Sequence, residues 1–128
     1  MAKREHWKSE PEPHDFPAAG DYLSLLLGRV ETGRLVRKLK ATQLTHAKAK
    51  DLLRASQLPL LPATDPEVVR DLRKVRKGEL LSPVLLVRGE LPLGIPLTIA
   101  DGYHRVCASY HLDEDAEIPC RLVDGPAA

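Results

Sequence analysis

The chain has 128 residues, of which 43% are apolar, with 19 Lys and Arg balanced by 18 Asp and Glu and with two cysteines. Its length suits a single domain with a buried core, and its cysteines are too few for a disulfide scaffold. No apolar run approaches the roughly 20 residues needed to cross a bilayer, and the N-terminus lacks the apolar segment of a signal peptide, so we expect a cytoplasmic protein without a membrane span.

Residues 1–20 are predicted to be a disordered tail. The segment is rich in charged residues and proline, and its large apolar side chains are Trp7 and Phe16. Such a composition offers too little apolar surface to offset the entropy lost when the chain orders.

Residues 21–63 are predicted to form a helical extension. One helix is expected over Asp21–Lys40 and a second over Thr45–Ser56, which Thr45 would cap. The leucines and prolines of Leu58–Pro62 then favour an extended segment packed against the core.

Residues 64–124 are predicted to form the core. Thr64-Asp65-Pro66-Glu67 combines a capping residue, an early proline and a first-turn glutamate, which together predict a helix that runs to about Lys77. The continuous apolar run Leu80–Arg88 predicts a strand covered on both faces, and Gly89–Pro96 is typical of a loop.

The next segment predicts a strand, a tight turn and a helix. Leu97–Ala100 is apolar and β-branched, and Asp101-Gly102 is typical turn chemistry. Apolar residues then recur at helical spacing, which predicts a helix with one buried face: Tyr103, Val106, Cys107 and Tyr110. After an acidic turn over 113–117, Ile118–Val123 predicts a closing strand. We interpret both cysteines, Cys107 and Cys120, as small buried apolar residues.

The start of this helix is the candidate site. Asp101 is expected to be its N-cap, and the free amides of Gly102, Tyr103 and His104 could hold an anion with the help of the helix dipole. His104 and Arg105 fall off the apolar stripe, and their donors suit a phosphate. Alternatively, Asp101 could help to hold Mg²⁺, or the motif could be only a capped core helix whose His and Arg make structural hydrogen bonds.

These residues resemble a known superfamily. Asp101-Gly102-Tyr103-His104-Arg105 before a helix of small residues, preceded by Leu81–Val87 and followed by Ile118–Val123, is similar to the ParB/sulfiredoxin-like superfamily over residues 64–123. The resemblance implies an α+β fold, a small mixed sheet packed with helices. It also implies nucleotide binding, with the phosphates at the start of the motif helix.

The motif differs between the branches of that superfamily. Sulfiredoxins carry their nucleophilic cysteine where this chain has Tyr103, which argues against sulfur chemistry. Partition proteins carry arginines where this chain has His104 and Cys107. The Asp-Gly-x-His-Arg form is closest to the free-serine kinase branch, whose catalytic glutamate has no identified counterpart in this sequence.

The leading hypothesis is a nucleotide-binding domain that transfers phosphoryl groups, hydrolyses a nucleotide or acts as a nucleotide switch. A nucleoside di- or triphosphate, with Mg²⁺ if Asp101 coordinates one, would lie at Asp101–Arg105. Arg105 would neutralise charge, and His104 and Asp101 are the candidate catalytic residues. Glu79 and Glu90 are the nearest upstream carboxylates that could serve as a base.

The alternative hypothesis is a nucleic-acid-associated or partition-related regulatory protein. Arg29–Lys77 carries 13 basic and 5 acidic residues, whereas 101–128 carries 2 and 6. Such a basic region could contact a phosphate backbone or an acidic partner. A third hypothesis is a regulatory or toxin-linked interaction module without catalysis. A nucleotide titration beside a duplex-DNA titration distinguishes the first two.

Overall fold

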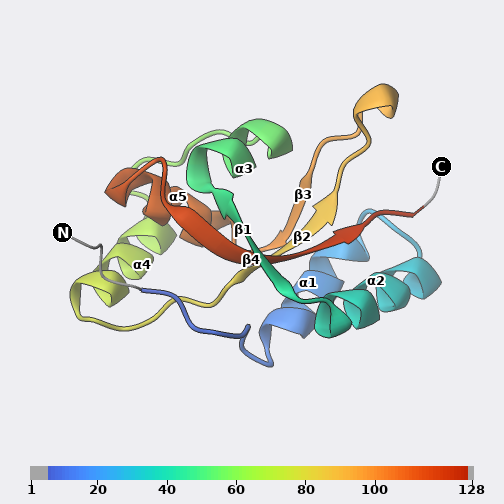
Figure 1. Cartoon of the computed structure of the whole chain (residues 1–128), viewed down its shortest axis with the longest axis horizontal. Coiled ribbons are helices and arrows are strands. Elements are labelled where there is room, and N and C mark those ends of the chain that lie inside the picture. The colour runs from blue at the N-terminus through green and yellow to red at the C-terminus, as the bar shows by residue number, and fades with distance from the viewer. Residues whose placement is uncertain (1–5, 127–128) are drawn as a thin grey trace.

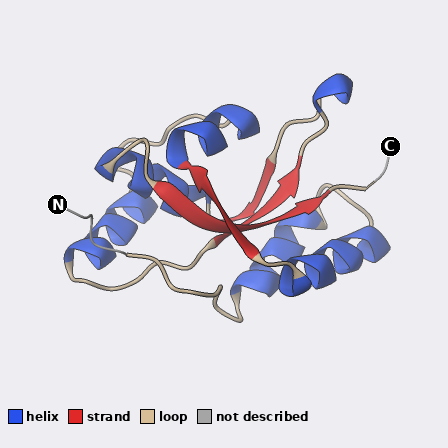
Figure 2. Ribbon diagram, viewed as in Figure 1, coloured by secondary structure: helices blue, strands red, loops and turns tan. Residues whose placement is uncertain are grey.

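The computed structural model describes residues 6–126, and over that range the chain is a mixed α+β fold (Figures 1 and 2). Its strands are β1 (Leu44–Lys48), β2 (Val84–Arg88), β3 (Thr98–Asp101) and β4 (Glu117–Asp124). Its helices are α1 (Asp15–Leu23), α2 (Arg29–Ala41), α3 (Ala49–Ser56), α4 (Pro66–Arg76) and α5 (Tyr103–Leu112), with a short 3₁₀ turn at Leu91–Leu93. Each of these helices is too short or too polar to cross a membrane.

The four strands form one mixed sheet in the order β1-β4-β2-β3. β4 pairs in parallel with β2, while β1 and β3 run antiparallel to their neighbours. The strand predicted over Leu80–Arg88 begins only at Val84, and its residues Val84–Val87 are buried, as the continuous apolar run predicts. The sheet therefore has β4 and β2 at its centre and β1 and β3 at its edges.

Helices cover both faces of this sheet, and β2 contributes alternate side chains to the two sides. Val84 and Leu86 join the core cluster with α3, α4 and α5, whereas Leu85 and Val87 join the cluster with α1 and α2. Figure 2 shows these two groups of helices on either side of the strands. Alternation along a strand is the expected result of its two-residue period.

The N-terminal segment differs from the predicted tail. Trp7 is only 6% exposed within the α3–α5 core cluster, and the backbone beside it is hydrogen-bonded to Leu81 through Lys8 N and His6 O, both at 2.8 Å. α1 begins at Asp15, and Phe16 packs into the other core cluster. This corrects the prediction of disorder for residues 6–20, because Trp7 and Phe16 each enter a cluster that the rest of the chain builds; residues 1–5 lie outside the described residues.

The 21–63 segment is helical in part, but it also contributes strand β1 to the sheet. The expected helix over 21–40 is interrupted between α1 and α2, and the expected helix from Thr45 begins instead at Ala49 because 44–48 forms β1. β1 pairs with β4 from Leu44↔Arg121 to Lys48↔Glu117. Pairing with a distant strand thus overrides the local helical pattern, and the segment shares one sheet with strands of residues 64–124.

Most of the remaining helix and strand predictions are confirmed. α4 begins as expected, with Pro66 in its first turn and the Asp65 carboxylate accepting from Glu67 N at 3.3 Å. β3, α5 and β4 begin within one residue of the expected positions. The acidic turn after α5 lies beside basic side chains, since Asp115 Oδ1 is 2.6 Å from Lys50 Nζ.

Candidate functional site

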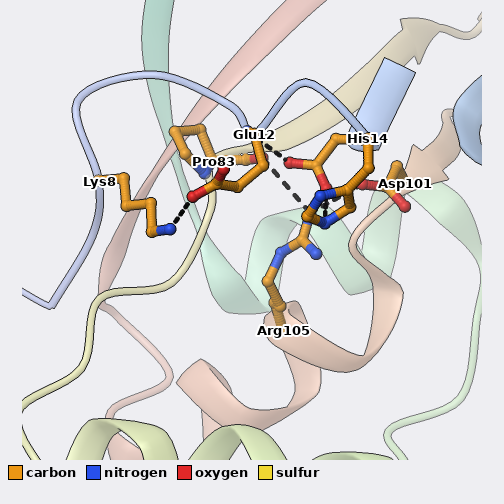
Figure 3. Close-up of polar contacts among 7 residues, drawn as sticks. Lys8, Glu12, His14, Pro83, Asp101 and Arg105 are labelled. Atoms are coloured by element: carbon orange, nitrogen blue, oxygen red, sulfur yellow. Dashed lines mark hydrogen bonds and ion pairs between the residues drawn. The ribbon is translucent and has the colours of Figure 1, made fainter. Parts of the chain in front are cut away.

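A polar cleft of about 520 Å³ opens at the start of α5. The N-terminal segment, α4, the Leu81–Ser82 connection and the β3–α5 turn form its walls. Its basic side chains are Lys8, His14, Arg70, Lys74, His104 and Arg105, and its carboxylates are Glu12, Asp15, Glu67, Asp71 and Asp101. Figure 3 shows part of this arrangement, with the N-terminal segment passing above Arg105.

Gly102 makes the β3–α5 turn possible. It has φ +114° at the N-cap of α5, and a Cβ placed there would lie 2.5 Å from Val84 Cγ1. Glycine avoids both the positive-φ penalty and this clash. Because Gly102 has no side chain, it provides no cap for the first-turn amides of Tyr103, His104 and Arg105, and the amide that bonds back to Gly102 O is that of Val106 at 3.0 Å.

Asp101 does not cap the helix, which corrects the sequence prediction. It is the last residue of β3, one position before the cap, and its Oδ2 accepts from Arg105 Nη2 at 3.0 Å (Figure 3). Arg105 also donates to Pro83 O at 3.4 Å, while its buried Nε finds no hydrogen-bond partner among residues 6–126. Arg105 is therefore anchored to the end of β3 and to the residue that precedes β2.

A second carboxyl group lies beside Asp101. Burial raises the pKa of Asp101, more than the neighbouring Arg105 charge lowers it, and the nearby Asp15 charge raises it further. Asp15 is buried on α1, and its Oδ2 accepts from Glu12 N at 2.9 Å. Sequence reasoning missed Asp15 because it assigned this segment to a tail.

Asp71 is another carboxylate that sequence reasoning missed. It is buried on α4, where burial raises its pKa against the opposing charges of Arg105, Lys74, Arg70 and His104. The cations that act on Asp71 are thus those of the cleft. One sequence signal could have found it, since Asp71 lies next to Leu72 on the inward side of a helix whose other charges face outward.

The structure brings Asp101, Gly102, Tyr103, His104 and Arg105 together at the cleft. It does not bring the two candidate bases there. Glu79 lies in an adjacent hollow beside Arg73 and Lys77, and Glu90 lies at the base of the β2–β3 hairpin.

The donor set at Asp101 does not fit a magnesium ion. One carboxylate oxygen is bonded to the Arg105 guanidinium, so a cation there would lie beside a positive charge. Over residues 6–126 there is also no group of three or more His, Cys, Asp or Glu side chains that could hold a metal. We therefore derive no step through a metal at Asp101.

Two other sequence predictions concern residues outside the cleft. Cys107 and Cys120 are buried, as predicted, and burial raises the pKa of Cys107 and brings that of Cys120 to about 11. The basic Arg29–Lys77 region does not form one surface, because α2 and α4 pack on opposite faces of the sheet (Figure 1).

Comparisons of the chain with protein families, with curated proteins and with solved structures found no match in any of the three.

Proposed function

We propose that this chain binds a nucleoside di- or triphosphate in the cleft at the start of α5, with the phosphates on the first-turn amides. In this proposal it acts in the cytoplasm as a phosphoryl-transfer enzyme, a nucleotide hydrolase or a nucleotide-dependent switch. The observation that carries the proposal is the helix start itself: an uncapped first turn opens into a cleft beside Arg70, Lys74 and Arg105. Free amides at a positive dipole end, with cations nearby, favour a phosphate.

The mixed charge of the cleft supports a nucleotide rather than inorganic phosphate alone. The cations on α4 and α5 favour the phosphates, whereas carboxylates such as Glu12 and Glu67 would repel them. Carboxylates accept hydrogen bonds from hydroxyl and amino groups, which a nucleoside carries on its sugar and base. A nucleotide therefore offers a partner to both kinds of side chain.

The similarity of Asp101–Arg105 to the ParB/sulfiredoxin-like motif supports the same ligand class. Within the proposal, Arg105 neutralises phosphate charge from a position fixed by Asp101 and Pro83. His104 is the candidate proton carrier, because an imidazole changes charge near neutral pH. Asp101 orients Arg105 and so has a positioning role rather than a metal-binding one.

The test is calorimetric titration of the full chain with ATP, CTP and ADP, with and without Mg²⁺. Lys74→Ala and Arg105→Ala should weaken binding, the second by about ten- to a hundredfold because a charge-assisted contact contributes roughly 1.5–3 kcal/mol. Arg105→Lys should lose less, since it keeps the charge. Arg76→Ala is the matched control, because Arg76 lies on the same helix but does not line the cleft.

Lys74→Ala keeps this test valid even if Arg105→Ala unfolds. Lys74 is exposed on α4, whereas the Arg105 guanidinium is hydrogen-bonded to Asp101 and Pro83. Absence of binding by all three nucleotides at millimolar concentration would overturn the proposal, as would equal effects of Lys74→Ala and Arg76→Ala. A parallel titration with duplex DNA at two salt concentrations tests the nucleic-acid alternative, which predicts affinity that falls steeply with salt.

A further inference from the structure

An apolar groove of about 510 Å³ lies at the end of the molecule that carries the end of β4 and the β2–β3 hairpin. Its walls come from the end of α1, the residues after α3, and strands β2 and β3. Its apolar lining includes Tyr22, Leu26, Leu27, Leu58 and Ile95. The groove shares no lining residue with the polar cleft, so a role for it is independent of the proposed function.

An apolar protrusion stands at the rim of this groove. The hairpin between β2 and β3 extends from the body of the molecule (Figure 1), and it carries Leu91, which is 92% exposed, and Leu93, which is 55% exposed. Ile95 belongs to both features, because it closes the base of the hairpin and lines the groove.

The protrusion has a fixed backbone. Glu90 and Ile95 exchange hydrogen bonds at 2.8 and 3.1 Å across its base, and Gly94 closes its tip with φ +69°. Gly89 lets the two sides approach, since a Cβ there would collide with the Ile95 carbonyl oxygen. The tip therefore presents its leucines outward instead of folding them into the adjacent groove.

We infer that this end of the molecule is a self-association surface, in which the Leu91–Leu93 tip of one copy enters the groove of a second copy. One face carries both an apolar protrusion and an apolar groove, and a two-fold arrangement would fill both grooves at once. A stable interface covers roughly 800 Å² per partner, which is about a tenth of the 7841 Å² surface of the chain. The reciprocal exchange doubles the contact that either tip alone could make.

The charges at this end favour a second copy over a membrane. Arg88 and Asp124 form an ion pair at 2.8 Å beside the groove, and Glu90 adds a further negative charge. Surfaces that bind anionic lipid carry an excess of Lys and Arg, which these three side chains do not provide. An apolar surface of this kind, rimmed by a few charges of both signs, is typical of a protein interface.

The first test is sedimentation velocity on the full chain from about 10 µM to about 500 µM, a range that resolves micromolar association. We expect a concentration-dependent dimer. Leu91→Glu in the tip and Leu26→Glu in the groove should each weaken association at least tenfold. Leu112→Glu is the control, because Leu112 is half exposed at the end of α5 and belongs to neither feature. A monomer throughout this range, or equal effects of Leu91→Glu and Leu112→Glu, would overturn the inference.

The second test distinguishes tip-in-groove contact from any other dimer. Chains with Leu91→Cys are mixed with chains carrying Leu26→Cys and are oxidised, while the native cysteines stay buried. The inference predicts a mixed disulfide between the two kinds of chain. It also predicts much less cross-linking between Leu91→Cys and Leu112→Cys chains. Equal cross-linking in both mixtures would show that the tip does not occupy the groove.

Discussion

Gly102 lies directly against the Val84 side chain, so that the start of α5 and the first residue of β2 are in contact where the cleft opens. Gly102→Ala should destabilise the fold by about 2–5 kcal/mol, because alanine meets both the positive φ and the Val84 methyl group. Urea unfolding measures this change. Gly33→Ala, at a helical site where a Cβ meets its nearest atom at 3.5 Å, is the control and should be neutral or stabilising. Similar stabilities for the two variants would contradict the contact.

Trp7 tests the order of the N-terminal segment. Trp7→Ala should cost about 3–5 kcal/mol, as expected when a large aromatic side chain is removed from a core. Trp7 is the one tryptophan of the chain, so native fluorescence should be blue-shifted and should move to longer wavelength on unfolding. If the segment were disordered, the tryptophan emission would be that of a solvent-exposed side chain. Trp7→Ala would then lower the free energy of unfolding by less than about 0.5 kcal/mol, as a surface substitution does.

Asp71 should make the stability of the protein depend on pH. Because burial raises its pKa above the ordinary 3.8, the folded state holds the proton more tightly than the unfolded state does. The resulting stabilisation is fully present below about pH 3.8 and is lost as the pH rises through the folded-state pKa.

Asp71→Asn should therefore be more stable than the wild type at about pH 7, and this advantage should shrink as the pH falls. Urea midpoints at several pH values measure the difference. Asp21→Asn, at an exposed position on α1, serves as the reference substitution. An advantage of Asp71→Asn that emerged only at low pH would have the opposite sign and would contradict the assignment.

The two thiols should be unreactive in the folded protein. Cys107 and Cys120 are buried, and burial raises the pKa of both, that of Cys120 to about 11, so little thiolate is present near neutral pH. Reaction with a chromogenic disulfide should be slow for the native chain. In urea, it should release two equivalents of the coloured thiol per chain, one for each cysteine. Rapid reaction of one thiol without denaturant would show that its site is open.

The sequence predicts the second half of the fold better than the first. α4 has its own cap at Asp65, and β2 is apolar from Val84 to Val87, so each of these elements can be identified from neighbouring residues alone. β1 cannot, because Leu44–Lys48 is mostly polar and becomes a strand only by pairing with Glu117–Arg121. Local propensity is a weak guide when a distant partner supplies the hydrogen bonds.

The candidate site also has a part that the sequence predicts and a part that it does not. The Asp-Gly turn and the helical spacing after it predict where His104 and Arg105 lie. The buried carboxylates that accompany them come from α1 and α4, which tertiary packing alone brings to the turn. The prediction of Asp101 as a cap is wrong for the same reason. β3 extends through Asp101, and the Asp101 carboxylate is hydrogen-bonded to Arg105 instead of to the first-turn amides.

The central position of β4 has a consequence for synthesis on the ribosome. β4 is the last of the strands to be made, yet β1 and β2 meet in the sheet only through it. Until residues 117–124 have left the exit tunnel, β1 lacks its hydrogen-bonding neighbour and one side of β2 stays open. The sheet is therefore completed late. A nascent chain stalled before β4 would expose strand edges of the kind that chaperones protect from aggregation.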